Sequence, residues 1–196
     1  MELFAQYTIG GLAIGSLYAL VALGIVLLYR TARILNFAHG DLATVGTFIA
    51  FTLLTTFRLP FAVATAASIT AAAGIGVAFF FIVLRPAKEA TLLGQIVITL
   101  GFALVLSGAA SLVWGADTKV FPFPLSETRV YRLGDVVVSQ ISIGTFLIGM
   151  ALMAGLYLLV QRTRLGLAMR AVSQHLVAAQ VLGIPAKRVF ALTWGL

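Results

Sequence analysis

The chain has 196 residues, of which 61% are hydrophobic and 10% are charged, and its mean hydropathy is +1.10. An ordinary soluble domain is far more polar, so this composition predicts an integral membrane protein. The formal net charge is +7, but the basic residues are scattered between apolar segments. We therefore attribute the charge to orientation in a bilayer and expect no nucleic acid partner. The absence of cysteine excludes disulfides, thiolate catalysis and cysteine-ligated metals.

A helix needs about 20 apolar residues to cross the ~30 Å hydrocarbon core of a bilayer. Four uncharged segments have this length, namely 8–29, 61–84, 91–114 and 141–160, whereas 42–57 is short for a span. The last residues, 189–196, begin a further apolar run that covers only about 12 Å. The sequence predicts an all-α fold: one polytopic transmembrane domain over 1–196 with about five spans and the start of a sixth. We expect this domain to continue beyond the C-terminus of the chain.

Small residues are spaced regularly along two of these spans. Gly11, Gly15 and Ala19 recur every four residues in the first span, and four glycines recur every seven residues in 91–115, at Gly94, Gly101, Gly108 and Gly115. Such stripes let another helix approach closely, so each predicts a helix contact.

The short segment 42–57 is preceded by the polar residues Asn36, His39 and Asp41, with Gly40 among them. Either a helix begins near Ile34 and places these side chains within the membrane, or the chain breaks at Gly40 and Asp41 caps a new helix. Both arrangements place polar groups near the membrane interior, which is costly and therefore indicates a transport path. The alternative is an interfacial loop whose polar groups face water.

The largest polar connection before the C-terminal region is 116–140, in which acidic and basic residues balance. Pro122 and Pro124 exclude a helix through its start. Residues 131–138 are typical of a small hairpin that turns at Gly134-Asp135. We expect this connection outside the cell, where it either contacts a partner protein or forms a plain surface hairpin.

A basic connection, 162–188, carries five basic residues and no acidic one, and it predicts a cytoplasmic loop. Its apolar residues recur every three or four positions, which indicates one or two short amphipathic helices that end at Gly183 and Pro185. The residues that share this apolar face are Leu165, Met169, Val172, Leu176, Ala179 and Leu182. An ordered apolar face suggests docking of a cytoplasmic partner, and the alternative is a helix that lies on membrane lipid.

The pattern Ala178-Ala179, three residues, Gly183-Ile184 resembles the cytoplasmic coupling loop of ABC importer permeases. In that family an Ala-Ala…Gly pattern forms a short helix that sits in a groove of the ATPase subunit. The family pattern usually has Glu before the two alanines, where this chain has Val177, a departure common to a sub-branch. The resemblance implies a set of ATPase-coupling residues: Val177, Ala178, Ala179, Gln180, Gly183 and Ile184.

Three further stretches extend the likeness over nearly the whole chain: 15–20 (GSLYAL), 36–41 (NFAHGD) and 162–171 (RTRLGLAMRA). Together they are similar to the LivH-type permease of branched-chain amino-acid ABC importers, whose close relatives carry urea or short amides. The resemblance implies a multi-pass subunit of the bacterial inner membrane. Its implied partners are a second homologous permease subunit, two ABC ATPase subunits and an extracytoplasmic substrate-binding protein.

Neither a cofactor nor a metal is expected, and the chain has no ATPase motif of its own. None of Lys88, Lys119 and Lys187 follows a glycine, so a P-loop is absent from the sequence and separate subunits would hydrolyse ATP. His39 and Asp41 are two residues apart and point in different directions on a helix, which disfavours an intramembrane enzyme. An ion-gradient-driven secondary transporter, with Asp41 carrying a proton, is the alternative transport mechanism.

If 162–188 is cytoplasmic, alternation of the spans places 30–41 and 85–90 inside and 58–60 and 116–140 outside. Nine of the thirteen basic residues then lie inside, and the N-terminus lies outside. A re-entrant segment at 34–41 would reverse the first helix. As a hypothesis for the substrate path, Asn36 or the helix N–H groups after Gly40 would meet a substrate carboxylate, and Asp41 would attract its ammonium group. His39 would donate a hydrogen bond or orient its neighbours.

Overall fold

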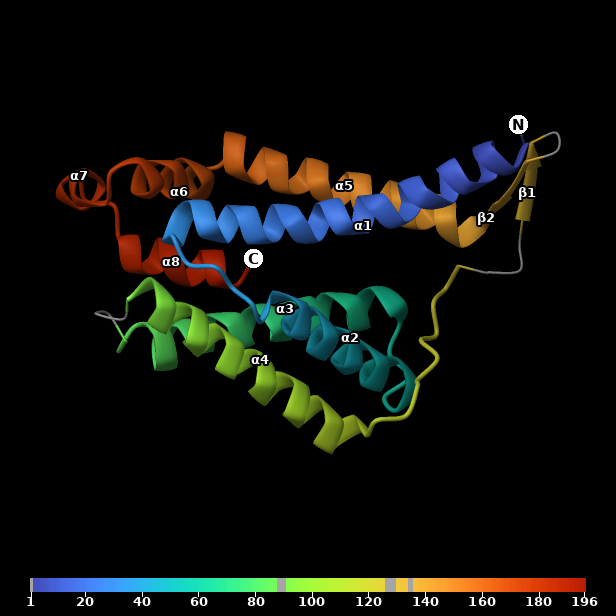
Figure 1. Ribbon diagram of the computed structural model, residues 1–196, viewed down its shortest axis with the longest axis horizontal. Helices are drawn as coiled ribbons and strands as arrows, with labels where there is room; N and C mark the ends of the chain where they lie inside the picture. The colour runs from blue at the N-terminus through green and yellow to red at the C-terminus, as the bar shows by residue number, and fades with distance from the viewer. Residues whose placement is uncertain (1, 88–90, 126–129, 134–135) are drawn as a thin grey trace.

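The computed structural model describes residues 2–87, 91–125, 130–133 and 136–196 of the chain. Figure 1 shows long helices that run roughly side by side, with one small hairpin near the N-terminal end of the first helix. The elements are α1 (Glu2–Ala32), α2 (His39–Thr55), α3 (Phe61–Phe79), the π-helix η1 (Phe80–Leu84), α4 (Leu92–Trp114), β1 (Val130–Leu133), β2 (Val136–Ser139), α5 (Gln140–Arg162), α6 (Arg164–Gln174), α7 (Leu176–Val181) and α8 (Ala186–Trp194).

Four helical segments in the described part of the chain are long and apolar enough to cross a membrane. They are Gln6–Ala32, Phe61–Leu84, Leu92–Trp114 and Gln140–Arg162. Each overlaps one of the four long spans expected from hydropathy, so the all-α multi-pass fold is confirmed. The short segment 42–57 corresponds to α2, whose 17 residues are at the lower limit for a crossing.

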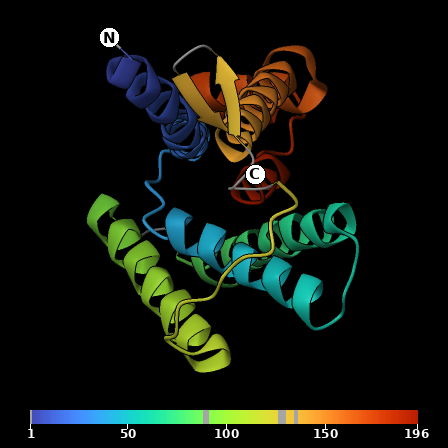
Figure 2. The same cartoon turned by 90° about the vertical axis from the view of Figure 1, so that its right-hand side faces the viewer.

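The helices form two groups that meet at α8. Figures 1 and 2 show α1 with α5, α6 and α7 in one group, and α2, α3 and α4 in the other. The helix α8 contacts α1 and α6 of the first group and α3 with η1 of the second. A buried cluster joins the two groups at this point, and its members are Leu28, Phe79, Phe80, Leu84, Ala191 and Trp194.

One side-chain hydrogen bond and two aromatic stacks hold the second group together internally. The Trp114 indole Nε1 of α4 donates a hydrogen bond of 2.7 Å to Thr52 Oγ1 of α2, and the Trp114 ring stacks on Phe48 with centroids 5.2 Å apart. The Phe79 ring at the end of α3 stacks on Phe102 of α4. A hydrogen bond between two side chains inside apolar surroundings sets the register of α2 against α4.

The predicted hairpin is confirmed in its strands. The strands β1 and β2 pair antiparallel, with Val130 opposite Ser139 and Leu133 opposite Val136. The expected turn at Gly134-Asp135 lies outside the described residues. The helix α5 begins directly after β2, and Ser139 Oγ caps it by accepting a hydrogen bond of 3.3 Å from Ser142 N.

At four positions of the small-residue stripes, the expected helix contact is not made within the described part of the chain. A Cβ atom built at Gly11, Gly15, Gly101 or Gly108 would meet nothing within 4 Å. Instead, α1 approaches α5 where Ser16 faces Gly149, at which an added Cβ would lie 2.7 Å from Ser16 Oγ. A regular spacing of small residues shows that one face of a helix carries small side chains. It does not show which neighbouring helix packs against that face.

The helices α3 and α8 cross closely at Gly76. A Cβ built at Gly76 would collide with the backbone carbonyl oxygen of Trp194 and would lie 3.1 Å from its carbonyl carbon. Because both obstacles are backbone atoms, no rotamer change relieves the clash. The absence of a side chain at Gly76 therefore lets α8 pack against α3.

We predict that Gly76→Ala destabilises the protein by about 1–3 kcal/mol, because the added methyl group forces α8 away from α3. Thermal unfolding of the purified, detergent-solubilised protein measures the effect as a lowered midpoint. Gly74→Ala is the matched control, since a Cβ at Gly74 of the same helix meets nothing within 4 Å. Equal midpoints for the two variants would contradict the close crossing.

Candidate functional site

The polar stretch between α1 and α2 is a break inside the bundle. The helix α1 ends at Ala32, and Arg33 then takes a left-handed conformation with φ of 59°. Figure 1 shows the linker running from the end of α1 back along the bundle before α2 begins. A helix beginning near Ile34 is therefore wrong. The break comes before His39, and the N-cap of α2 is Ala38 in place of the expected Asp41.

Asn36 and Thr99 supply hydrogen-bond partners to this linker. Asn36 is 6% exposed, and its Oδ1 accepts a hydrogen bond of 3.0 Å from Ala38 N. The fully buried Thr99 of α4 places its hydroxyl 3.2 Å from the carbonyl oxygen of Leu35. Non-helical backbone at membrane depth is tolerated only where protein groups satisfy it. These two side chains meet part of that requirement, and Asn36 is buried and does not face water.

His39 and Asp41 lie on different sides of α2. The imidazole of His39 lies against α1, because a Cβ built at Gly24 would be 2.7 Å from His39 Nε2. Asp41 instead faces α4 and lines a cavity of about 160 Å³. The three predicted path residues thus do not converge: Asn36 is bound into the turn, His39 contacts α1, and Asp41 alone lines this cavity.

The cavity beside Asp41 carries three hydroxyl groups that the sequence analysis did not select. Thr44 comes from α2, and Ser107 and Ser111 come from α4. The sequence signal for these residues was their spacing. Asp41 and Thr44 are three residues apart and Ser107 and Ser111 are four residues apart, so each pair lies on one helix face. Four polar side chains facing one another across two apolar helices form a polar strip that lipid does not solvate.

The C-terminal loop turns sharply at the junction of α5 and α6. Thr163 Oγ1 accepts a hydrogen bond of 3.1 Å from Gly166 N and donates one of 2.5 Å to the carbonyl oxygen of Leu159. A Cβ built at Gly166 would collide with the carbonyl oxygens of Leu159 and Val160. A threonine cap followed by a glycine in the first turn therefore lets α6 fold tightly onto the end of α5.

The helix α7 is short and is closed at both ends. His175 is extended, and its Nδ1 accepts a hydrogen bond of 3.2 Å from Ala178 N at the start of α7. At the other end Gly183 has φ of 83°, Ile184 N donates to Ala179 O at 2.9 Å, and Gly183 N donates to Gln180 O at 3.0 Å. This pair of bonds is a Schellman motif, which confirms the predicted stop at Gly183.

The six predicted coupling residues divide between the two sides of this segment. Ala179 is buried against Met169 and Val172 of α6, and Ile184 packs partly buried against the same cluster. The other four, Val177, Ala178, Gln180 and Gly183, are exposed. The buried side chains of Ala179 and Ile184 anchor the segment, so the four exposed residues are held in a fixed position.

The predicted apolar face is partly wrong. Met169, Val172 and Ala179 are buried, but Leu176 is 41% exposed and Leu182 is 81% exposed. The extended residue His175 interrupts the helix, so the period established in α6 does not carry over to α7. The exposed apolar surface at the tip consists of Val177, Val181 and Leu182, of which sequence reasoning selected only the first for coupling.

Residues 7–196 match the family model described as the permease component of the branched-chain amino acid transport system. The chain belongs to this permease family. It is 31% identical, over 97% of its length, to the high-affinity branched-chain amino acid transport system permease protein BraD of Pseudomonas aeruginosa. It is 25% identical to LivH of Escherichia coli, again over 97% of its length.

A further relative is the probable branched-chain amino acid transport permease protein LivH of Methanocaldococcus jannaschii, 27% identical over 94% of this chain. The chain spans 66% of the length of BraD and of the Escherichia coli LivH, and 60% of the Methanocaldococcus protein. The comparison with solved structures found no match.

We predict that His175→Ala weakens α7, because the change removes the acceptor for Ala178 N and costs about 1 kcal/mol of helix stability. Hydrogen exchange of the α7 amides is the measurement, and the variant should exchange several-fold faster there. His175→Asn is the matched control, since asparagine also caps helices, and it should retain most of the protection. Unchanged exchange in His175→Ala would show that the cap does not hold this helix.

Proposed function

We propose that the protein is a membrane-spanning permease subunit of an ATP-driven importer for branched-chain amino acids or related small polar solutes. Separate ATPase subunits would bind at α7, and a second, similar permease and an extracytoplasmic binding protein would complete the transporter. Membership of the permease family supports the importer over the ion-gradient-driven alternative. The observation that carries the proposal is the exposed apolar surface of α7.

The position of α7 suits a docking role. Figure 1 shows it at the tip of the molecule, beyond the ends of α1 and α5. The exposed fractions of Val177, Val181 and Leu182 are 63%, 82% and 81%. Apolar side chains gathered on a rigid tip outside the spans indicate a protein contact. In the proposed complex a groove of the ATPase subunit covers them.

The charge distribution supports a cytoplasmic α7. In the folded chain the C-terminal ends of α1 and α5 and the end of η1 lie toward the same end as α6 and α7 (Figure 1). Basic residues at this end include Arg30, Arg85, Arg162, Arg164 and Arg188. Basic connections stay on the cytoplasmic side, so we place this end inside and the β1–β2 hairpin outside.

For the substrate path we propose separate roles for the three polar residues of the break. Asp41 would attract the ammonium group of an amino acid substrate from its cavity, with Thr44, Ser107 and Ser111 offering hydroxyl groups. The start of α2 has no side-chain cap among the described residues, and although His39 N donates to Asn36 O at 3.4 Å, the next N–H groups, after Gly40, suit a carboxylate. Asn36 would hold the turn, and His39 would hold α2 against α1.

We predict that Asp41→Asn lowers substrate uptake at least tenfold, because the change removes the charge that meets the ammonium group while keeping the side chain's size. Uptake of radiolabelled leucine by cells that express the complete transporter is the measurement, with the amount of folded permease checked in parallel. Asp117→Asn, in the exposed connection after α4, is the control. Normal uptake by Asp41→Asn would remove this residue from the path.

We predict that Leu182→Ser lowers transport-coupled ATP hydrolysis by about tenfold, because a contact residue of the ATPase groove loses its apolar side chain. The side chain is 81% exposed, so the thermal midpoint of the isolated permease should hardly change. Leu167→Ser is the matched control, since Leu167 is an exposed leucine of α6. If both variants hydrolyse ATP during transport as fast as the unmodified protein, α7 is not the docking site of the ATPase subunit.

A further inference from the structure

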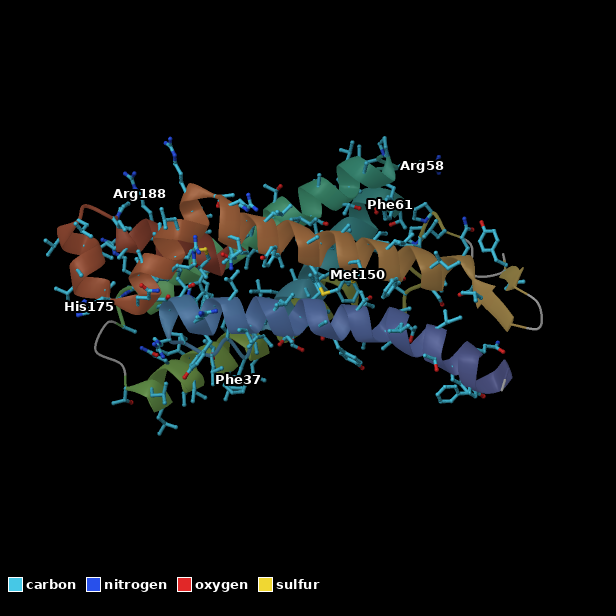
Figure 3. The ribbon with its side chains drawn as sticks, turned by 90° about the horizontal axis from the view of Figure 1, so that it is seen from above. Phe37, Arg58, Phe61, Met150, His175 and Arg188 are labelled. Atoms are coloured by element: carbon cyan, nitrogen blue, oxygen red, sulfur yellow. The ribbon has the colours of Figure 1, made fainter. Side chains whose placement is uncertain are left out.

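A cavity of about 560 Å³ lies between α1, α5 and α6, away from the Asp41 cavity. Its walls are mainly apolar, and its polar residues come from the ends of α1 and α5 and from α6. Figure 3 shows Met150, one of its lining residues, on α5 at the side that faces α1. None of the roles proposed above uses this cavity.

The polar groups gather at one end of this cavity. Arg30 and Thr31 come from the last turn of α1, Gln161 from the last turn of α5, and Arg170 from α6. Toward the other end the lining residues include Leu23 of α1 and Met150 and Met153 of α5. None of the described residues that line the cavity is acidic. The cavity is thus an apolar slot with a positively charged mouth.

Arg170 is held at this mouth with part of its donor capacity unused. Its guanidinium donates to Gln161 Oε1 at 3.1 Å and to the Gln161 carbonyl oxygen at 3.4 Å. Its Nε is buried and has no hydrogen-bond partner among the described residues. A buried donor without a partner is costly, and guanidinium groups pair well with phosphate oxygens.

The length of the slot matches one leaflet of a bilayer. From Met150 to Gln161, α5 rises about 16 Å, and from Leu23 to Arg30, α1 rises about 10 Å. Half of the hydrocarbon core is about 15 Å thick. An occupant with an anionic group at the arginines and an apolar chain along Met150 and Met153 therefore extends from the membrane surface toward its middle plane.

We propose that this cavity binds an anionic phospholipid of the cytoplasmic leaflet, such as phosphatidylglycerol. The phosphate pairs with Arg30 and Arg170, and one acyl chain lies in the slot between α1 and α5. Basic pockets between membrane helices on the cytoplasmic side are suited to such headgroups. Because Arg170 belongs to α6, the lipid bridges the membrane helices and the segment that carries α7.

The test is native mass spectrometry of the complete transporter in detergent, titrated with phosphatidylglycerol or phosphatidylcholine. The protein should bind phosphatidylglycerol in preference to phosphatidylcholine, and Arg170→Gln should weaken that binding about tenfold, because a charge-assisted contact is lost. Ala154→Phe fills the slot without changing charge and should weaken binding similarly. Arg164→Gln is the matched control, since this exposed arginine of α6 does not line the cavity.

Four outcomes would overturn the proposal. Equal binding of the two lipids would show that the arginines select no headgroup. Binding of phosphatidylglycerol that survives both Arg170→Gln and Ala154→Phe would place the lipid elsewhere. Displacement of the lipid by millimolar glycerol phosphate would show a site for the free phosphate group with no role for the slot. Failure of the unmodified transporter to bind phosphatidylglycerol would indicate that a protein segment fills the cavity.

Discussion

Backbone groups inside a membrane have no water to bond, and the linker between α1 and α2 finds hydrogen-bond partners inside the protein. Asn36 bonds its own turn, and Thr99 of α4 reaches the carbonyl oxygen of Leu35. These contacts fix where α2 begins, and the start of α2 in turn places His39 against α1 and Asp41 toward α4. The arrangement of the proposed path thus depends on how the break is satisfied.

The segment formed by α6 and α7 is tied to both groups of helices through α8. Met169, Val172 and Ala179 form one cluster with Ala186 and Val189, the first residues of α8. The far end of α8 crosses α3 at Gly76, where no side chain separates the two backbones. Packed interfaces of this kind transmit displacements because they are not compressible. In the proposed importer, a movement of α7 would therefore reach α3 as well as α5.

Hydropathy and length were enough to predict the four long spans, because lipid imposes a minimum apolar length on each. Local chemistry predicted the stop at Gly183 and the hairpin strands, since both depend on residues close in the chain. Contacts between residues far apart in the chain could not be predicted from the sequence. No local pattern shows that Gly24 faces His39 or that Ser107 faces Asp41. The break at His175 exposed Leu176 and Leu182 of the predicted apolar face, because an extended residue interrupts the helical period, whereas Ala179 stayed buried.

Site-directed crosslinking tests the central claim, that α7 is the binding site for an ATPase subunit. The 196 residues contain no cysteine, so Gln180→Cys introduces one exposed thiol on α7. Ala179→Cys, at a position 3% exposed on the same helix, is the matched control. With a cysteine in the ATPase groove of the complete transporter, the account predicts an oxidative crosslink from Gln180→Cys that changes with ATP, and little from Ala179→Cys. No crosslink from Gln180→Cys or Val177→Cys in a folded complex would contradict it.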